Sequence, residues 1–242
     1  MWFAALTGSQ CVHKTLYSDA GSGVLLNFTG GIVLQGRAVP KGIVVLPNSL
    51  CAQVMSLSPG AILSGVRFYP AVGYSILGEM EARVSMLSTT HPLYLSLHRV
   101  YERLCRTSNA AEHIDVLTQW ADQHCLGQIP PVSLSQSILS LCDGKQFADV
   151  SQELPLSQRQ LERQFKQWLG MSPKYFQQIT RVKRSITHLK RYPSHPLADV
   201  AALFGFSDQA HMTREFRRFA QHTPAQIRGP QLSANVRATS TP

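Results

Sequence analysis

Residues 157–173 read SQRQLERQFKQWLGMSP, and residues 208–224 read DQAHMTREFRRFAQHTP. The two stretches match at an offset of 51 positions, and the matched pairs include Arg163 and Arg214, Phe165 and Phe216, and Pro173 and Pro224. Similarity at a fixed offset indicates that one structural unit is used twice. The chain is therefore predicted to contain two copies of one basic helical unit near its C-terminus.

The first copy has start and stop signals for a helix on both sides. A short helix over 146–153 and a turn at Leu154–Leu156 precede Ser157. Ser157 is a suitable N-cap, with Gln160 as its capping-box partner. Gly170 ends this helix, and proline at the first position of the next helix follows at 173. The inward side chains are predicted to be Leu161, Phe165, Trp168 and Leu169.

The second copy repeats this order. A short helix over Leu197–Phe206 is closed by Gly205, and Ser207 is predicted to cap the next helix, with Asp208 in its first turn. Met212, Phe216 and Phe219 are expected inside. Between the copies, residues 173–190 predict one helix of roughly 27 Å. A rigid spacer of that length could place two recognition helices about one DNA turn, roughly 34 Å, apart.

The excess positive charge of the chain is confined to the part that holds the repeat. Residues 1–144 contain 8 Lys and Arg and 8 Asp and Glu, whereas residues 145–242 contain 15 and 6, which gives the whole net charge of +9. This asymmetry points to a polyanionic partner. The alternative is a charged face that only interacts with water.

The outward faces of the two helices suit DNA. Residues spaced three or four apart share a helix face, and here these are arginines, lysines and amides. Arginine can bond two acceptors on guanine, and glutamine two positions on adenine. Basic residues farther along a helix suit phosphates, which position a protein without specifying sequence. One such helix could be an ordinary amphipathic helix, but two matched units in the basic part favour a DNA reader.

The residues from about Pro131 to Arg228 resemble the AraC-type transcriptional regulators. The resemblance rests on LSQRQLERQF, LGMSPKYF, LADVAALFGFSDQAHMTREFRRF and HTPAQIR, in that order and spacing. It implies two helix-turn-helix units in adjacent major-groove segments. The base-facing positions would be Arg159, Glu162, Arg163, Gln209, Ala210, His211, Thr213 and Arg214, and the phosphate contacts Ser157, Lys166, Lys174, Arg217 and Arg218. Glu162 could accept from cytosine or orient a neighbouring arginine.

The first 90 residues look β-rich. Val24–Phe28 and Ile32–Gly36 flank Thr29–Gly31, which predicts a hairpin, and Ile43–Pro47 and Ala61–Pro70 read as further strands. Short strands separated by Gly and Pro indicate a small barrel or sandwich. The run GVRFYP at 65–70 is similar to a GVRFxPG segment of sensor domains that precede some such regulators. The glycine that usually follows the proline is Ala71 here.

Helical spacing begins after Pro92. Residues 93–104 and 114–121 have apolar side chains at helical intervals. These helices could pack on each other or form a dimer seam. The expected fold class is α+β, with a β-rich regulatory domain at 1–90, a helical connector at 91–127, an all-α double helix-turn-helix domain at 128–229 and a flexible tail at 230–242.

Several other classes of protein find no support in the sequence. It contains no Walker A loop and no GxSxG motif, and His13 is the only histidine before His91, so no HxH metal motif is present. We expect no catalytic residue, metal or cofactor. The longest uncharged stretch is interrupted by Pro and Asn, so no membrane span is expected, and the N-terminus lacks a signal-peptide pattern. The five cysteines, including Cys125 beside His124, are expected to be free thiols.

The sequence thus predicts a cytoplasmic, bacterial, sequence-specific transcription regulator that binds double-stranded DNA. RNA polymerase, a small-molecule or protein effector of the N-terminal domain, and a second copy of the chain are further candidate partners. Two rival functions stay open: the DNA-binding domain could be fused to a repair or modifying enzyme, or the basic helices could bind an acidic protein.

Overall fold

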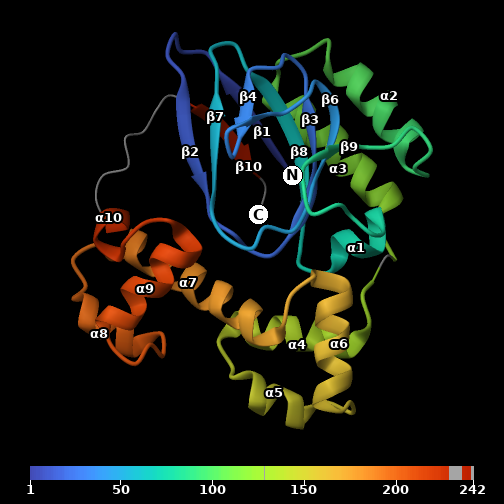
Figure 1. Ribbon diagram of the computed structural model, residues 1–242. Helices are drawn as coiled ribbons and strands as arrows, with labels where there is room; N and C mark the ends of the chain where they lie inside the picture. Colours follow the sequence, from blue (N-terminus) through green and yellow to red (C-terminus); the bar gives the residue numbers. More distant parts are fainter. Residues whose placement is uncertain (128, 229–235, 241–242) are drawn as a thin grey trace.

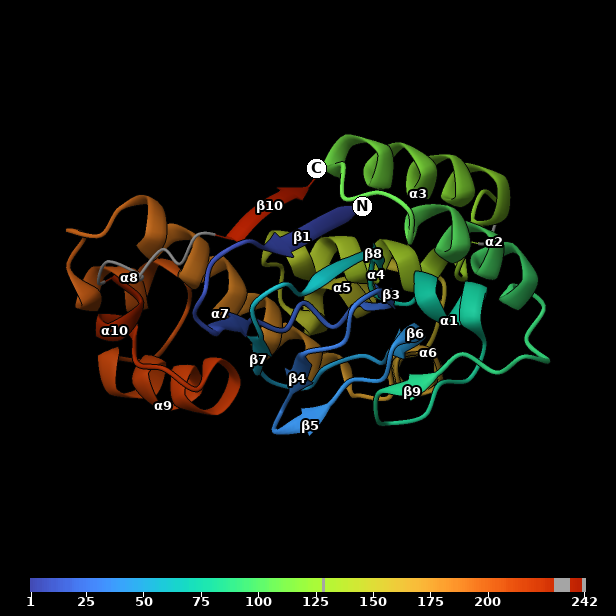
Figure 2. The same ribbon diagram turned by 90° about the horizontal axis from the view of Figure 1, so that it is seen from above.

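The computed structural model describes residues 1–127 and 129–228, together with the backbone of residues 236–240. Figure 1 shows the β-strands gathered in the upper half of the molecule and the helices that follow residue 131 in the lower half. Seen from above, two further helices lie along one side of the strands (Figure 2). The α+β class predicted from the sequence is confirmed.

The strands form two antiparallel sheets. The larger sheet contains β1 (Trp2–Leu6), β3 (Ser22–Asn27), β6 (Gly42–Leu46), β8 (Ile62–Phe68), β9 (Ser85–Met86) and β10 (Val236–Ser240), in the order β10-β1-β8-β3-β6-β9. The smaller sheet contains β2 (Val12–Leu16), β4 (Ile32–Leu34), β5 (Arg37–Ala38) and β7 (Gln53–Leu57), in the order β2-β7-β4-β5.

The central strands of the larger sheet are buried on both faces. Successive strand residues point to opposite faces: Leu25 and Val44 contribute to the core between the sheets, whereas Val24 and Val45 pack toward the helices behind. This double burial explains why the sequence of β6 is a continuous apolar run. Fully burying one such side chain contributes about 1.5–3 kcal/mol.

The hairpin expected around Thr29–Gly31 is wrong. β3 pairs with β6 and β8, while β4 pairs with β5 and β7, so the chain crosses from one sheet to the other at this point. Gly30 and Gly31 both have positive φ, and the Asn27 side chain accepts from the Gly30 N–H at 3.0 Å. The two-residue hairpin lies one strand later: β4 and β5 are joined by Gln35 and Gly36, both with positive φ.

Helices cover the outer face of the larger sheet. α2 (Tyr94–Leu104) and α3 (Ala110–His124) pack on each other and on this face, burying Leu97, Leu117 and Trp120. The sequence left open whether these helices pack on each other or form a dimer seam. Their inward faces pack within the chain. The short α1 (Val72–Leu77) follows β8, and Ala71 before it has a φ of 68°. That left-handed conformation is why glycine suits this position.

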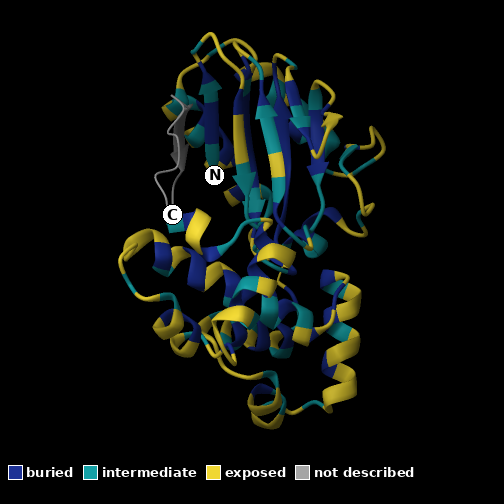
Figure 3. Ribbon diagram, turned by 60° about the vertical axis from the view of Figure 1, so that its left-hand side comes forward, coloured by how far each residue is buried: buried dark blue, intermediate teal, exposed yellow. Residues whose placement is uncertain are grey.

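The lower half consists of α4 (Val132–Asp143), α5 (Phe147–Glu153), α6 (Gln158–Leu169), α7 (Pro173–Arg191), α8 (Leu197–Leu203), α9 (Gln209–Ala220) and α10 (Pro224–Arg228). These helices share one apolar core, in which Phe165, Phe176 and Phe216 are fully buried. The predicted helices are confirmed, although α8 ends at Leu203 rather than Phe206. Figure 3 shows buried positions on the inner faces of these helices and exposed positions on the outer ones.

The predicted tail at 230–242 falls largely outside the described residues. Of this segment the structure describes the backbone of β10, which pairs antiparallel with β1 at the edge of the larger sheet. The described part is thus a strand that follows the helical half in sequence yet lies beside the first strand of the chain.

Candidate nucleic-acid interface

α6 begins with the capping box expected from the sequence. The Ser157 Oγ accepts from the Gln160 N–H at 3.3 Å, and the Gln160 side chain accepts from the Ser157 N–H at 2.9 Å. Gly170 ends the helix with a φ of 69°. Leu161, Phe165 and Leu169 are buried, as predicted, while Trp168 is half-buried. These caps and the apolar stripe fix which side of α6 faces solvent.

The solvent side of α6 presents the predicted polar residues. Arg159, Glu162, Arg163 and Lys166 are all exposed. Gln158 donates to Glu162 Oε1 at 2.8 Å, which holds the carboxylate along the helix. The Lys166 ammonium reaches forward to the Gly170 carbonyl oxygen at 3.2 Å. Arg159 and Arg163 thus project near the N-terminal end of the helix, whereas the Lys166 side chain points to its C-terminal end.

α9 has the same design with a different cap. Asp208, not Ser207 as expected, is the N-cap residue, and its side chain accepts from the His211 N–H at 2.6 Å. This hydrogen bond is the main cause that holds the pKa of Asp208 below its usual value of 3.8. A charged carboxylate here is stabilised by the helix dipole. The helix therefore starts one residue later than the sequence pattern suggested.

His211 points back into the turn before α9. Its Nδ1 accepts from the Ser207 N–H at 3.2 Å, and its Nε2 lies 3.4 Å from a Glu215 carboxylate oxygen. The ring also meets Phe206 edge-on at 5.7 Å between centroids. Of the base-facing candidates on α9, the exposed ones are Gln209, Ala210 and Arg214, while Thr213 is half-buried and donates to the Gln209 carbonyl oxygen at 2.9 Å.

A buried ion pair that the sequence patterns did not reveal holds α9 to α7. Arg181 donates through Nη2 to both Glu215 carboxylate oxygens, at 2.7 and 2.8 Å, and through Nη1 to the Gly205 carbonyl oxygen at 3.0 Å. The side chain of Glu215 is 7% exposed and that of Arg181 20%. Glu215 follows Met212 by three positions and so lies on the apolar side of α9. An acid at such a position is a signal that a buried partner exists.

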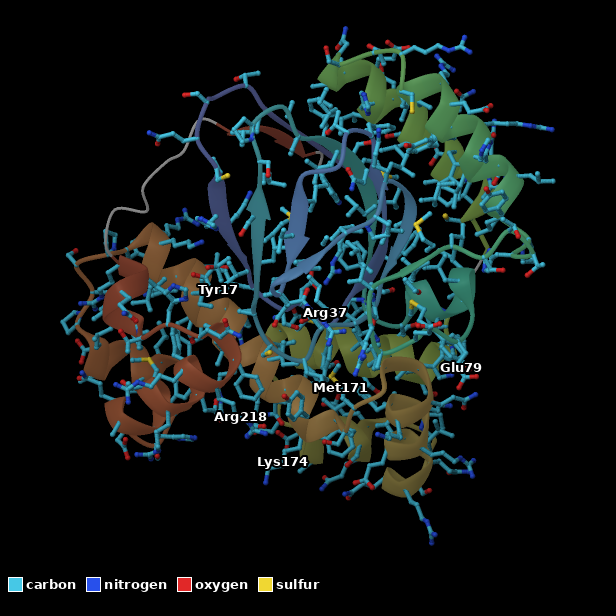
Figure 4. All side chains as sticks on the ribbon, turned by 45° about the horizontal axis from the view of Figure 1, so that its top comes forward. Tyr17, Arg37, Glu79, Met171, Lys174 and Arg218 are labelled. Atoms are coloured by element: carbon cyan, nitrogen blue, oxygen red, sulfur yellow. The ribbon has the colours of Figure 1, made fainter. Side chains whose placement is uncertain are left out.

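The phosphate candidates lie in different surroundings. Arg217 and Lys174 are exposed, on α9 and in the first turn of α7 respectively. Arg218 is exposed as well, but its guanidinium stacks 5.2 Å from the Tyr175 ring and 4.9 Å from the Phe219 ring. Figure 4 shows Arg218 and Lys174 on the helical side of the boundary with the strands. Ser157 is committed to the cap described above.

A cavity of about 870 Å³ lies between the strand half and the C-terminal end of α6. Its walls carry basic side chains (Arg37, Arg83 and Lys166), acidic ones (Glu79 and Glu81) and apolar ones that include Leu34, Leu50, Met80 and Trp168. In Figure 4 Arg37 lies at this boundary. The cavity is therefore lined by both halves of the molecule, with positive charge and an aromatic ring on its wall.

The two halves also meet through ion pairs. The Asp19 carboxylate accepts from the Arg67 guanidinium of β8, and its second oxygen lies 3.8 Å from the Lys183 ammonium of α7. Burial would raise the pKa of Asp19, but hydrogen bonding and charge attraction from Arg67, with help from the Gly21 N–H and Lys183, hold it below 3.8. A charged Asp19 thus joins the larger sheet to the helix between the two repeats.

The cysteines are free thiols, as expected. Burial, with the nearby Asp122 charge, raises the pKa of the Cys125 thiol to about 11, so this thiol stays protonated. The adjacent His124 donates through Nδ1 to the Trp120 carbonyl oxygen at 2.9 Å, and its ring stacks on the Trp120 ring. Within the described residues, no group of three or more His, Cys, Asp or Glu could hold a metal ion, and no helix is long and apolar enough to span a bilayer.

Comparison with known proteins identifies a matching family and several relatives. Residues 150–229 match a family described as "Helix-turn-helix domain". The chain is 28% identical to the "HTH-type transcriptional activator RhaS" of Shigella sonnei (strain Ss046) over 89% of this chain and 84% of that protein. Against RhaS of Escherichia coli (strain SE11), the 28% identity covers 50% of this chain and only 37% of the relative.

Among solved structures, the fold is similar to that of ToxT from Vibrio cholerae O395 bound to (E)-4-(8-methylnaphthalen-1-yl)but-3-enoic acid. The TM-score is 0.50 at 15% sequence identity, and the alignment covers 94% of this chain and 96% of ToxT. At this identity the likeness concerns the fold. It includes both the strand half and the helical half, because the alignment spans nearly the whole of each chain.

Proposed function

We propose that the chain is an AraC-type helix-turn-helix transcription regulator and that it reads two adjacent major-groove segments of one DNA duplex through α6 and α9. The observation that carries this proposal is the matched pair of helices. Each has a capped N-terminus, a buried apolar stripe and an exposed basic face. α7, of 19 residues, separates them by roughly 28 Å of helix.

We assign base contacts to the exposed residues near the two helix N-termini. On α6 these are Arg159, Glu162 and Arg163, and on α9 they are Gln209, Ala210 and Arg214, with Thr213 at the edge. His211, which is bonded within the turn, would have to leave Ser207 in order to reach a base. Phosphate contacts are assigned to Lys166, Lys174, Arg217 and Arg218, whose positive charges suit the backbone, and to Ser157, whose hydroxyl can hydrogen-bond a phosphate oxygen.

The rival functions are less well supported. The relatives are named transcriptional activators, which does not favour a repair or modifying enzyme. A protein-interaction module would use the same basic faces without sequence preference. Activation would also require contact with RNA polymerase, which we propose on the strength of those relatives. We keep the proposed boundaries of a regulatory domain at 1–90, a connector at 91–127, whose outer face could pair two copies, and a DNA-binding domain at 128–229.

We further propose that the cavity between the halves takes a small amphipathic carboxylic acid as effector. The similar ToxT structure is bound to a naphthyl butenoic acid. The cavity here offers Arg37 and Arg83 to a carboxylate and Leu34 and Trp168 to an apolar body. Binding sites of this volume and mixture are typical for small molecules. The naphthyl acid bound to ToxT is the first probe to test on this chain.

Selection of bound sequences from a random DNA pool tests the main proposal. Full-length protein at a fixed salt concentration should enrich a bipartite site with two half-sites about 10 base pairs apart. The variant with Arg163→Ala should lose preference in one half-site, and Arg214→Ala in the other. Equal recovery of random and enriched DNA would contradict sequence-specific reading and favour the protein-interaction alternative.

A further inference from the structure

One loop of the strand half contacts the ends of both recognition helices. The bridging loop, residues 47–52, connects β6 to β7 and meets the helical half at the lower end of the sheets (Figure 1). Asn48 Nδ2 donates to the Leu169 carbonyl oxygen at 3.3 Å, at the end of α6. The Ala52 N–H donates to the Phe219 carbonyl oxygen at 2.7 Å, at the end of α9.

These hydrogen bonds satisfy groups that the helices leave open. The last four carbonyls of a helix have no partner within it. Leu169 and Phe219 are both among these last residues, so the bridging loop supplies one donor to each helix end. Ala52 is fully buried. Because an unpaired backbone group costs free energy when it is buried, the hydrogen bond of the Ala52 N–H stabilises this contact. The loop is thus fixed at two points, one on each repeat.

The two repeats differ in the residue that follows the recognition helix, and this difference adds a contact between the bridging loop and the end of α9. Gly170 and Gln221 occupy matching positions after the two helices, and both are left-handed, with φ of 69° and 59°. The left-handed conformation strains the backbone of glutamine but not that of glycine. The Gln221 side chain donates to the Ala52 carbonyl oxygen at 3.0 Å. The residue that costs backbone strain is therefore the one that bonds the bridging loop.

A third contact lies between the other two. The Tyr175 hydroxyl, from the first turn of α7, donates to the Leu50 carbonyl oxygen at 3.3 Å. The Tyr175 ring packs edge-on against Phe219 at 5.2 Å. The bridging loop consequently contacts α6, α7 and the C-terminal end of α9, which are the elements whose relative placement decides how two recognition helices meet DNA.

From these contacts we infer that the bridging loop sets the separation of α6 and α9, and with it the spacing of half-sites that the protein accepts. This inference rests on the proposed function. Adding one base pair moves a half-site by about 3.4 Å and about a tenth of a turn. α7 alone joins the two units along the chain, and bending there would accommodate such a shift. Asn48, Gln221 and Ala52 are positioning residues that oppose this bending and do not touch DNA.

The test measures spacing preference in the full-length chain. The operator obtained by selection is rebuilt with its half-sites one or two base pairs closer or farther apart, and affinities are measured at one salt concentration. For the wild type we expect about a tenfold loss for a change of one base pair, and for Asn48→Ala combined with Gln221→Asn about threefold. Asparagine tolerates the left-handed conformation, so this substitution shortens the side chain without disturbing the turn.

Two matched controls separate spacing from other effects. Gln167→Ala removes an exposed amide at the same end of α6, and Gln10→Ala removes one from the strand half; both should keep the wild-type profile. Binding to a single half-site should be equal in all variants. If the double variant fails to fold, Tyr175→Phe, which deletes one hydroxyl, replaces it and should also broaden the profile.

The outcomes distinguish this inference from the proposed function. A folded double variant or Tyr175→Phe variant with the wild-type spacing profile would show that the bridging loop does not set the spacing, while sequence preference stands. Equal loss at every spacing would assign the loop a structural role only. A wild type without any sequence preference would overturn the proposed function and this inference with it.

Discussion

Arg214 and Arg217 are both exposed on α9, yet their positions predict different roles. Arg214 lies one turn nearer the N-terminus, which enters the groove in helix-turn-helix proteins. Arg214→Ala should cost about 1–3 kcal/mol on the best operator and relax one base position, while Arg217→Ala should weaken all sequences alike and reduce the salt slope by about one. Titrations on the selected operator and on shuffled DNA compare the two. Equal losses on both DNAs for Arg214→Ala would assign that residue to phosphate.

Glu215 makes a prediction about stability rather than recognition. Removing one partner from a buried ion pair leaves the other charge uncompensated, so Glu215→Ala should lower the free energy of unfolding by about 3 kcal/mol or more. Arg181→Met combined with Glu215→Leu removes both charges and should cost less than Glu215→Ala alone. Urea denaturation of the wild type and the two variants measures their free energies of unfolding. If the double variant is the less stable one, the ion pair itself stabilises the contact between α7 and α9.

At this scale the sequence predicts which side of a helix is buried but not what a polar side chain binds. Leu161, Phe165 and Met212 follow from their spacing, because burial depends on position along a helix. By its spacing His211 fits either side of α9, and only the fold shows that its ring turns toward Ser207. Hydrogen-bond partners come from other elements, and a repeat pattern contains no information about them.

Among the elements, the contact between β8 and α7 through Asp19 depends on pH. The pKa of Asp19 is lower in the folded chain than its usual 3.8, so the unfolded chain binds the proton more readily. The stabilisation is therefore complete above about pH 4 and is lost as pH falls through the lower folded pKa. Asp19→Asn should show a weaker loss of stability in this acid range than the wild type. Thermal unfolding between neutral pH and pH 3 compares them, and parallel curves would contradict the assignment.

Helix ends were predictable because their signals are local. Ser157 with Gln160, and Gly170 with Pro173, specify a start and a stop within a few residues of each other. Strand pairing is not local: Thr29–Gly31 reads as a hairpin turn, but the partners of β3 come from β6 and β8, far along the chain. Burial on both faces of β3 decided this pairing, and that burial is a property of the assembled sheets.

For the whole molecule, confinement of the net positive charge to residues 145–242 predicts a salt-dependent interaction with DNA. With roughly five to eight phosphate contacts, log affinity should fall with log salt at about −0.9 per contact. Gel-shift or fluorescence titrations from low to physiological salt measure the slope. A wild-type slope near zero would mean that the basic faces do not lie on phosphates. Residues 1–144, with equal numbers of acidic and basic residues, add little to the salt dependence.

The cavity between the halves is where the sequence was least informative, since its walls come from distant segments such as Arg37, Arg83 and Trp168. If the amphipathic carboxylic acid probe binds there, linkage requires that it change DNA affinity by the same factor by which DNA changes its own affinity. Both titrations should therefore give one factor, of about 5–150 for a typical coupling. Arg37→Ala should weaken the probe and leave DNA affinity without the probe unchanged. A probe that leaves DNA affinity unchanged would not be an effector, and an Arg37→Ala variant that binds the probe as the wild type does would place its site outside this cavity.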